Sequence, residues 1–226
     1  MKAREIIEAE YISKDLSEEE IIELFDWTEG NKKIATSSSY KFVMLKSILD
    51  CIIKYEKERF SFKEIFERFT QIYWVLVGQY GLEQTDNKTR LPYVETIIKE
   101  YIGENNSGKS LKLKFSDLNE NIKKHIVDRV IKDCKQVVFG ALYKDMQGYM
   151  YSFSKLKEYV IINPIFIKCI KKHFIEIENM IYEGLAKYLY RVNDENKIFL
   201  IKENIDTLSN QDDEYAIYKG LFYKEF

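Results

Sequence analysis

The sequence predicts an all-α fold, a multi-helix globular domain with one small β-hairpin. Helix breakers are scarce, with 9 Gly and 2 Pro among 226 residues. Apolar residues recur at the spacing of amphipathic helices over most of the chain. Aromatic residues make up 15% of the sequence. Few breakers and many large side chains favour helices with short connections around a substantial core, and we expect residues 1–226 to form a single helical domain.

The first predicted helix begins at a capping box. The Ser17 hydroxyl and the Glu20 carboxylate can each accept a hydrogen bond from the other residue's backbone N–H, and the helix extends to about Trp27 before Gly30 ends it. The polar stretch that follows ends in four hydroxyl residues at positions 36–39, which are good N-caps for the next helix.

The next helix, over about residues 40–56, is predicted to lie at the centre of the fold. Apolar side chains nearly surround it, and its polar residues Lys46, Asp50 and Lys54 form one narrow stripe. A helix that is apolar over most of its circumference is buried on most sides.

A second apolar helix starts at another capping box, Ser61 with Glu64. Its apolar face is formed by Phe62, Ile65, Phe66, Phe69, Ile72, Tyr73 and Val77. Only a short charged link joins it to the preceding helix, so we expect the two to pack together. The residues expected at this contact are Phe42, Leu45, Leu49 and Ile52 from the first helix, and Phe62, Phe66, Phe69 and Tyr73 from the second.

Two more helices are predicted in the middle of the chain. Pro92 opens one that runs to Ile102, between polar loops at 81–90 and 103–110. The other covers residues 117–138, follows a cap at Ser116, and carries the apolar positions Leu118, Ile122, Ile126, Val130 and Cys134.

The only strand signal lies between residues 139 and 162. Tyr149, Tyr151 and Phe153 alternate with smaller or more polar residues, and residues 145–148 have the composition of a turn. This change of period from helical to alternating predicts the small hairpin.

The longest predicted helix begins with Asn163 as its cap and Pro164 at its first position, and it continues to about Asn193. The tail after it is expected to form two short helices divided near Ser209. Residues 194–226 could also connect the domain to a further C-terminal module.

The charge balance excludes one functional class. Lys and Arg number 35 and Asp and Glu number 37, which gives a net charge of −2. The chain therefore lacks the basic excess of a dedicated nucleic-acid binder, and any contact with DNA must be a local patch.

The cysteines and the N-terminus indicate a cytoplasmic, soluble protein with no membrane partner. Cys51, Cys134 and Cys169 are odd in number and lie far apart in apolar stretches, which favours reduced thiols and excludes a Cys-x-x-Cys metal knuckle. Glu5 and Glu8 interrupt the N-terminal stretch that a signal peptide would need. No 18-residue window is apolar and uncharged.

The start of the central helix is the candidate nucleic-acid interface. Its serine hydroxyls, lysine ammoniums and free backbone N–H groups could together bind a phosphate. The candidate residues are Lys32, Lys33, Ser38, Ser39, Tyr40 and Lys41. The alternative is a capped helix start with solvated lysines. In both cases we expect Lys32, Lys33 and Lys41 to be exposed.

Three other patterns in the sequence could indicate chemical sites. The segment from Gly103 to Ser110 fits the P-loop pattern GxxxxGK[ST]. A P-loop follows a buried strand, but the sequence before this segment predicts an amphipathic helix. We therefore expect an exposed turn. Glu195 and Lys197 resemble half of a Mg²⁺-dependent nuclease core whose other half is missing. His125 and His173 lack the partners of a zinc site. The sequence thus predicts no catalytic residue, metal or cofactor in this chain.

Two segments together resemble a known family. They are TSSSYKFVMLKSILDCI, residues 36–52, and FSFKEIFERFTQIYWVLVGQYGL, residues 60–82. They are similar to the N-terminal helical region of bacterial HNH endonuclease family proteins, whose catalytic module lies downstream and carries paired Cys-x-x-Cys knuckles and a His that activates water. That module is absent here, and no catalytic residue can be carried over.

The resemblance implies a DNA-recognition or regulatory helical domain of an HNH-type, restriction or defence-like endonuclease. Such a domain would position double-stranded DNA or a protein partner and would leave hydrolysis to the nuclease module. One alternative is a helical protein-interaction module, such as a toxin–antitoxin component, without a DNA role. The third is a P-loop NTPase.

Overall fold

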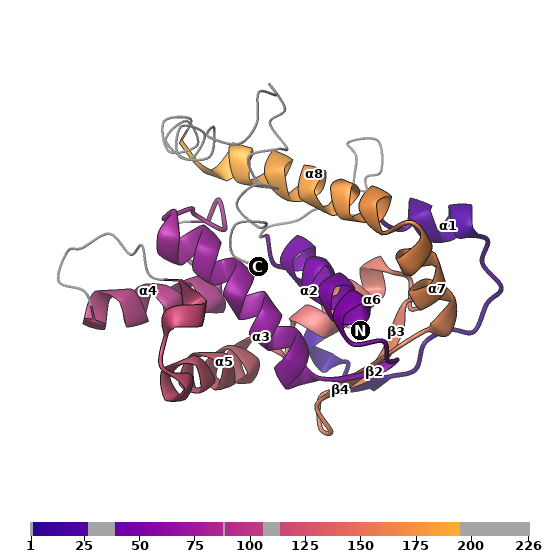
Figure 1. Ribbon diagram of the computed structural model, residues 1–226, viewed down its shortest axis with the longest axis horizontal. Coiled ribbons are helices and arrows are strands. Elements are labelled where there is room, and N and C mark those ends of the chain that lie inside the picture. The colour runs from indigo at the N-terminus through magenta and orange to yellow at the C-terminus, as the bar shows by residue number, and fades with distance from the viewer. Residues whose placement is uncertain (1, 27–38, 88, 106–113, 195–226) are drawn as a thin grey trace.

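A computed structural model describes residues 2–26, 39–87, 89–105 and 114–194 of the chain. Most of these residues are helical, and a small antiparallel sheet lies at one end (Figure 1). The predicted helical character is therefore correct, but the sheet is larger than the predicted hairpin. The α-helices are α1 (Glu18–Glu23), α2 (Tyr40–Lys54), α3 (Phe62–Tyr73), α4 (Tyr93–Asn105), α5 (Glu120–Cys134), α6 (Val138–Asp145), α7 (Pro164–Lys172) and α8 (Phe174–Val192).

The centre of the fold is formed by α2, which packs against α3 and α8. All eight residues predicted at the contact of the two apolar helices are buried, with at most 4% of any of them exposed. The close approach of α8 depends on Gly184, because a Cβ atom there would lie 2.4 Å from Cε1 of Phe42. The prediction of a central helix pair is thus confirmed, and α8 also packs against α2 (Figure 1).

Local capping signals set the helix starts. Both predicted capping boxes are present: Ser17 and Glu20 exchange hydrogen bonds of 3.2 and 2.8 Å, and Ser61 and Glu64 exchange bonds of 3.3 and 2.9 Å. Asn163 caps α7 by accepting a 3.2 Å hydrogen bond from the N–H of Ile165, as predicted.

Two of the predicted helices are each divided in the structure. Residues 117–138 form α5 and the start of α6, and α5 is capped by Asn119 because Ser116 belongs to the short 3₁₀ helix η3 (Phe115–Asp117). The long C-terminal helix breaks at His173 into α7 and α8. This break lets α7 pack against α1 while α8 continues along α2. The predicted tail beyond Asp194 lies outside the described residues.

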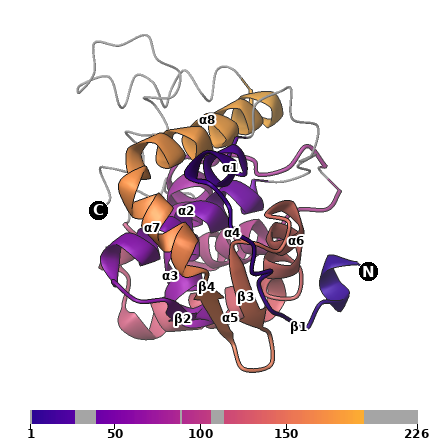
Figure 2. The ribbon, with the colours of Figure 1, turned by 90° about the vertical axis from the view of Figure 1, so that its right-hand side faces the viewer.

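The sheet has the strand order β1-β3-β4-β2, and every neighbouring pair is antiparallel. Its centre is the hairpin of β3 (Tyr151–Ser154) and β4 (Tyr159–Ile162), so the prediction that residues 145–148 form the hairpin turn is wrong. That segment, with positive φ at Gln147 and Gly148, turns the chain from α6 into β3. The edge strands β1 (Glu8–Ala9) and β2 (Arg59–Ser61) are too short to leave an alternating pattern in the sequence (Figure 2).

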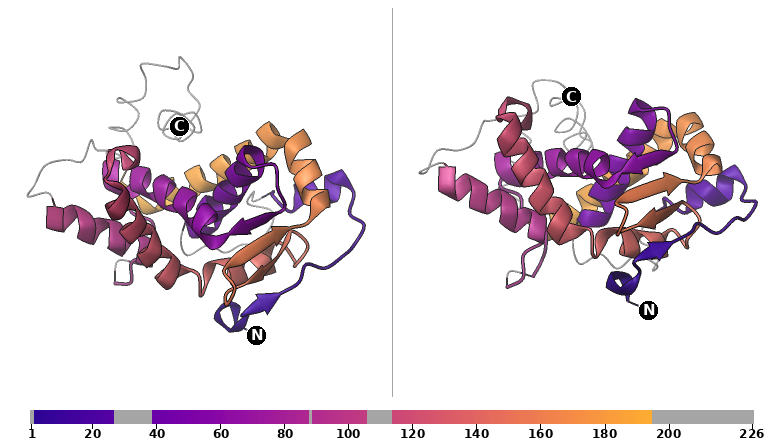
Figure 3. Two further views of the ribbon diagram at one scale, coloured as in Figure 1. Left: turned by 60° about the horizontal axis from the view of Figure 1, so that its bottom comes forward. Right: turned by 90° about the horizontal axis from the view of Figure 1, so that it is seen from below.

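The N-terminal 3₁₀ helix η1 (Ala3–Glu5) lies next to the sheet and contacts α6 (Figure 3). The three cysteines are free and buried. Among the described residues, no helix is long and apolar enough to cross a membrane.

Candidate functional site

The structure changes the interpretation of the start of α2. Ser39 is buried, and its hydroxyl forms hydrogen bonds with the Tyr73 hydroxyl at 2.8 Å and with Oε1 of Gln84 at 2.7 Å. It is therefore a core residue, and it does not present its hydroxyl to a phosphate at the surface. The candidates Lys32, Lys33 and Ser38 lie outside the described residues.

Lys41 was expected to be exposed, and this expectation is wrong. Its ammonium lies 2.7 Å from Oδ2 of Asp145, and the two side chains are 12% and 13% exposed. Burial raises the pKa of Asp145 above its ordinary value, and the hydrogen bond from Lys41 opposes that rise. Lys41 thus compensates an interior carboxylate that the sequence pattern could not reveal.

Tyr40, the remaining candidate, lines a cleft. Burial, assisted by the nearby Asp145 carboxylate, raises the pKa of Tyr40 to about 12, so its hydroxyl stays protonated. The cleft has a volume of about 370 Å³, and we call it the arginine cleft. Its polar lining consists of Arg4, Tyr40, Thr85, Asn87, Arg90 and Tyr93, and its apolar lining includes Phe69, Val94, Val137 and Val138.

The electrostatic character of the arginine cleft is one-sided. None of the described residues that line it carries a carboxylate. Arg4 and Arg90 are both exposed, and within the described part of the chain neither guanidinium has a hydrogen-bond or ion-pair partner. Two guanidinium groups whose N–H donors have no partner among the described residues, in a cleft whose described lining has no carboxylate, favour a negatively charged ligand.

Arg4 is held in place through its backbone. A Cβ atom on Gly140 of α6 would lie 2.2 Å from the carbonyl oxygen of Ala3, so η1 can approach α6 only because this residue is glycine. The buried Lys155 ammonium donates to the carbonyl oxygens of Arg4 at 3.2 Å and Gln136 at 2.7 Å. Burial lowers the pKa of Lys155. These contacts position η1 and leave the Arg4 side chain to the cleft.

The other side of the cleft is formed by residues from 85–87 and 89–92 and by the first residues of α4. The side chain of Asn193 accepts from the N–H of Glu83 at 2.7 Å and donates to its carbonyl at 2.9 Å, which fixes the start of this segment. The carbonyl of Asn87 accepts a 3.2 Å hydrogen bond from the N–H of Arg90. Tyr93 is the first residue of α4, so the first turn of that helix also borders the cleft.

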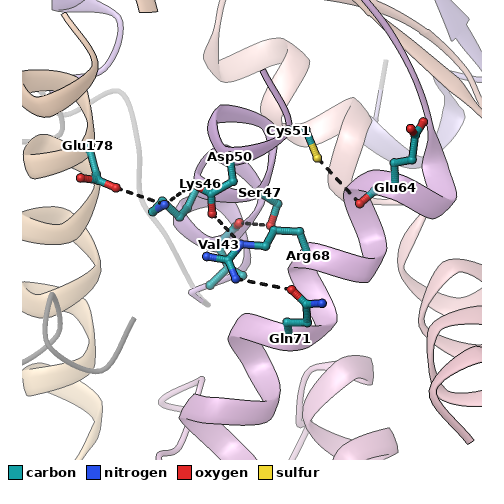
Figure 4. A network of polar contacts seen from close by, with 9 residues as sticks. All are labelled: Val43, Lys46, Ser47, Asp50, Cys51, Glu64, Arg68, Gln71 and Glu178. Carbon is teal, nitrogen blue, oxygen red and sulfur yellow. Dashed lines mark hydrogen bonds and ion pairs between the residues drawn. The ribbon is translucent and has the colours of Figure 1, made fainter. Parts of the chain in front are cut away.

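A second, larger cleft of about 540 Å³ lies between α2, α3 and α8. Its floor is an acid–base cluster formed by Lys46, Asp50, Arg68 and Glu178 (Figure 4). The Lys46 ammonium binds both carboxylates and lies 3.1 Å from Oε1 of Glu178, while Nε of Arg68 lies 2.5 Å from Oδ2 of Asp50. The two cations and two carboxylates balance each other, so this cluster is a structural link between three helices.

The neighbouring Cys51 does not supply a nucleophile to this cleft. Burial, with a further contribution from the Asp50 carboxylate, raises the pKa of the Cys51 thiol to about 12. Its sulfur lies 3.7 Å from the carbonyl oxygen of Glu64 (Figure 4). A protonated, buried thiol is a poor nucleophile.

The other patterns from the sequence are also placed. Gly103 lies in the last turn of α4, so a helix and not a strand precedes the P-loop-like segment, whose residues 106–110 are outside the described ranges. His173 contacts Glu18 at 3.0 Å and Glu176 at 3.3 Å, and His125 is exposed. In the parts of the chain that the structure describes, no three His, Cys, Asp or Glu side chains are grouped so that they could hold a metal ion. Glu195 and Lys197 lie outside these parts.

Comparisons of the chain with protein-family models, with curated proteins and with solved structures find no match.

Proposed function

We propose that this domain binds nucleic acid through the arginine cleft and leaves any hydrolysis to another module. The observation that carries the proposal is the cleft itself, which is lined by Arg4, Arg90, Tyr40 and Tyr93 and has no acidic residue among the described residues of its lining. Guanidinium groups bind phosphate oxygens in a bidentate way, and tyrosine rings stack on bases.

Further features support the same proposal. The N-terminal turn of α4 borders the cleft, and the partial positive charge of a helix N-terminus favours phosphate. A local cationic patch also agrees with the net charge of −2, which leaves no global attraction to DNA. The resemblance of residues 36–52 and 60–82 to HNH endonuclease family proteins supports a nuclease as the parent protein.

The test is binding of a fluorescently labelled oligonucleotide, measured by anisotropy across a salt series. Arg4→Ala and Arg90→Ala should each weaken binding roughly tenfold or more, because a hydrogen bond to a charged group contributes about 1.5–3 kcal/mol. Each should also lower the slope of log affinity against log salt by about one unit.

The matched control is Arg59→Ala, which removes one positive charge from β2, outside the cleft, where the guanidinium stacks on Tyr159 at 3.9 Å. This variant should keep the affinity and the slope of the unmodified protein to within about one half-unit. If the domain has no affinity for any oligonucleotide at low salt, the proposal fails and the helical protein-interaction module becomes the better hypothesis.

A further inference from the structure

We propose that the arginine cleft receives a single unpaired nucleotide, with the base inside the cleft and its phosphate at the two arginines. This inference rests on the proposed nucleic-acid binding and goes further, because it names the form of nucleic acid that is recognised. The domain would then prefer single strands, or duplexes with an extruded nucleotide, over fully paired DNA.

The shape of the site supports an unpaired ligand. The cleft is a concave space of about 370 Å³, enclosed between η1, the starts of α2 and α4, and the α5–α6 junction. This volume lies within the range of about 300–1,000 Å³ that is usual for pockets that enclose small ligands. A base that is paired and stacked within a duplex cannot enter such a space unless it is flipped out of the helix.

The lining of the cleft suits a nucleobase. Leu91, Pro92 and Val137 line the cleft without being buried, and they offer an apolar surface. The buried side chains of Phe69, Val94 and Val138 lie in the same lining. The hydroxyl of Tyr40 and the side chain of Asn87 add polar groups to the same lining. Cys134 also lines the cleft, and burial raises the pKa of its thiol to about 12, so it brings no negative charge.

The groups that would bind the phosphate and stack on the base are more exposed. Arg4 and Arg90 approach the cleft from segments far apart in the chain, and both side chains are exposed. Tyr93 is 49% exposed, which leaves much of its side chain accessible to a base. Stacking on tyrosine tolerates any base, so the site would distinguish unpaired from paired nucleotides and not one sequence from another.

A binding experiment with three labelled oligonucleotides of one sequence tests this inference: a single strand, a perfect duplex, and a duplex with one bulged nucleotide. We expect the single strand and the bulged duplex to bind at least about tenfold more tightly than the perfect duplex at the same salt concentration. Tyr93→Ala should weaken single-strand binding at least about fivefold, because stacking on one aromatic ring contributes about 1–3 kcal/mol per base. Tyr93→Phe keeps the ring and should bind like the unmodified protein.

Competition separates recognition of the base from recognition of phosphate alone. A deoxynucleoside monophosphate should displace the labelled single strand at concentrations at which inorganic phosphate does not. If both displace it equally, or if all three oligonucleotides bind alike and Tyr93→Ala changes nothing, the inference is wrong although nucleic-acid binding stands. If none of the three binds, the proposed function itself has failed.

Discussion

Removing the Lys41 ammonium tests the interior role that the structure gives it. In Lys41→Met the Asp145 carboxylate stays buried without its cation, which is 2.7 Å away in the unmodified protein. Breaking a buried ion pair from one side costs about 3–5 kcal/mol. The Lys41 and Asp145 side chains are still 12% and 13% exposed. We therefore expect the free energy of unfolding to fall by about 3 kcal/mol, near the lower end of this range.

A loss of this size is easily measured. For a domain of about this length each kcal/mol lowers the melting temperature by roughly 2–4 °C, so Lys41→Met should melt about 6–12 °C lower at pH 7. Adding Asp145→Leu removes the unpaired carboxylate and should recover most of the loss. Lys171→Met, which breaks an exposed pair with Glu56, is the control and should cost less than about 1 kcal/mol. The reasoning is refuted if urea unfolding shows a loss below about 1 kcal/mol for Lys41→Met, or no recovery in the double variant.

Two further predictions concern the elements next to the clefts. Gly140→Ala places a Cβ against the Ala3 carbonyl and should displace η1. Oligonucleotide affinity should therefore fall as much as in Arg4→Ala, while near-UV circular dichroism should show an intact core. An unchanged affinity would contradict the role of this packing in positioning Arg4. Hydrogen bonds from Lys172 and, to a smaller extent, from His173 lower the pKa of the Glu18 carboxyl to about 2. The stability they contribute is present above the unfolded pKa near 4.5 and is lost as the pH falls towards 2. The difference in urea midpoint between Glu18→Gln and the unmodified protein should therefore shrink as the pH falls below about 5, and a difference that stays constant from pH 5 to pH 3 would refute this.

The features that the sequence predicted correctly depend on residues close together in the chain. The capping boxes at Ser17 and Ser61 and the cap at Asn163 involve partners within three positions. The apolar faces of α2 and α3 were also correct, because a face is fixed by the helical period alone. Local signals of this kind need no knowledge of the tertiary structure.

The errors arose where a distant residue decides the outcome. Lys46 belongs to the polar stripe of α2, yet it is 5% exposed because Glu178, from α8, supplies a buried carboxylate that the sequence pattern does not reveal. The apolar period continues unbroken through His173, so the break between α7 and α8 has no sequence signal. The turn residues near Gly148 do form a turn, but it joins a helix to a strand.

The arginine cleft could not be predicted for the same reason. Arg4 and Arg90 are 86 positions apart by their numbering, and no motif links them. They line one cleft only because η1 packs on α6 and because residues 85–87 and 89–94 line the same cleft as the start of α2. Three of the candidate residues that the sequence suggested, Ser39, Tyr40 and Lys41, lie in the described part of the chain, and of these Tyr40 lines this cleft.

Two groups of positive charges among the described residues have different consequences. Lys41, Lys46 and Arg68 bind interior carboxylates, so their charges are compensated within the fold. Arg4 and Arg90 have no such partner among the described residues, and their cleft has no acidic lining. Arg4 and Arg90 are the charged side chains in the described lining of this cleft, although the net charge of the chain is −2. Binding through this cleft alone should therefore have a log–log salt slope of about −2 at most, well below that of a protein that contacts many phosphates.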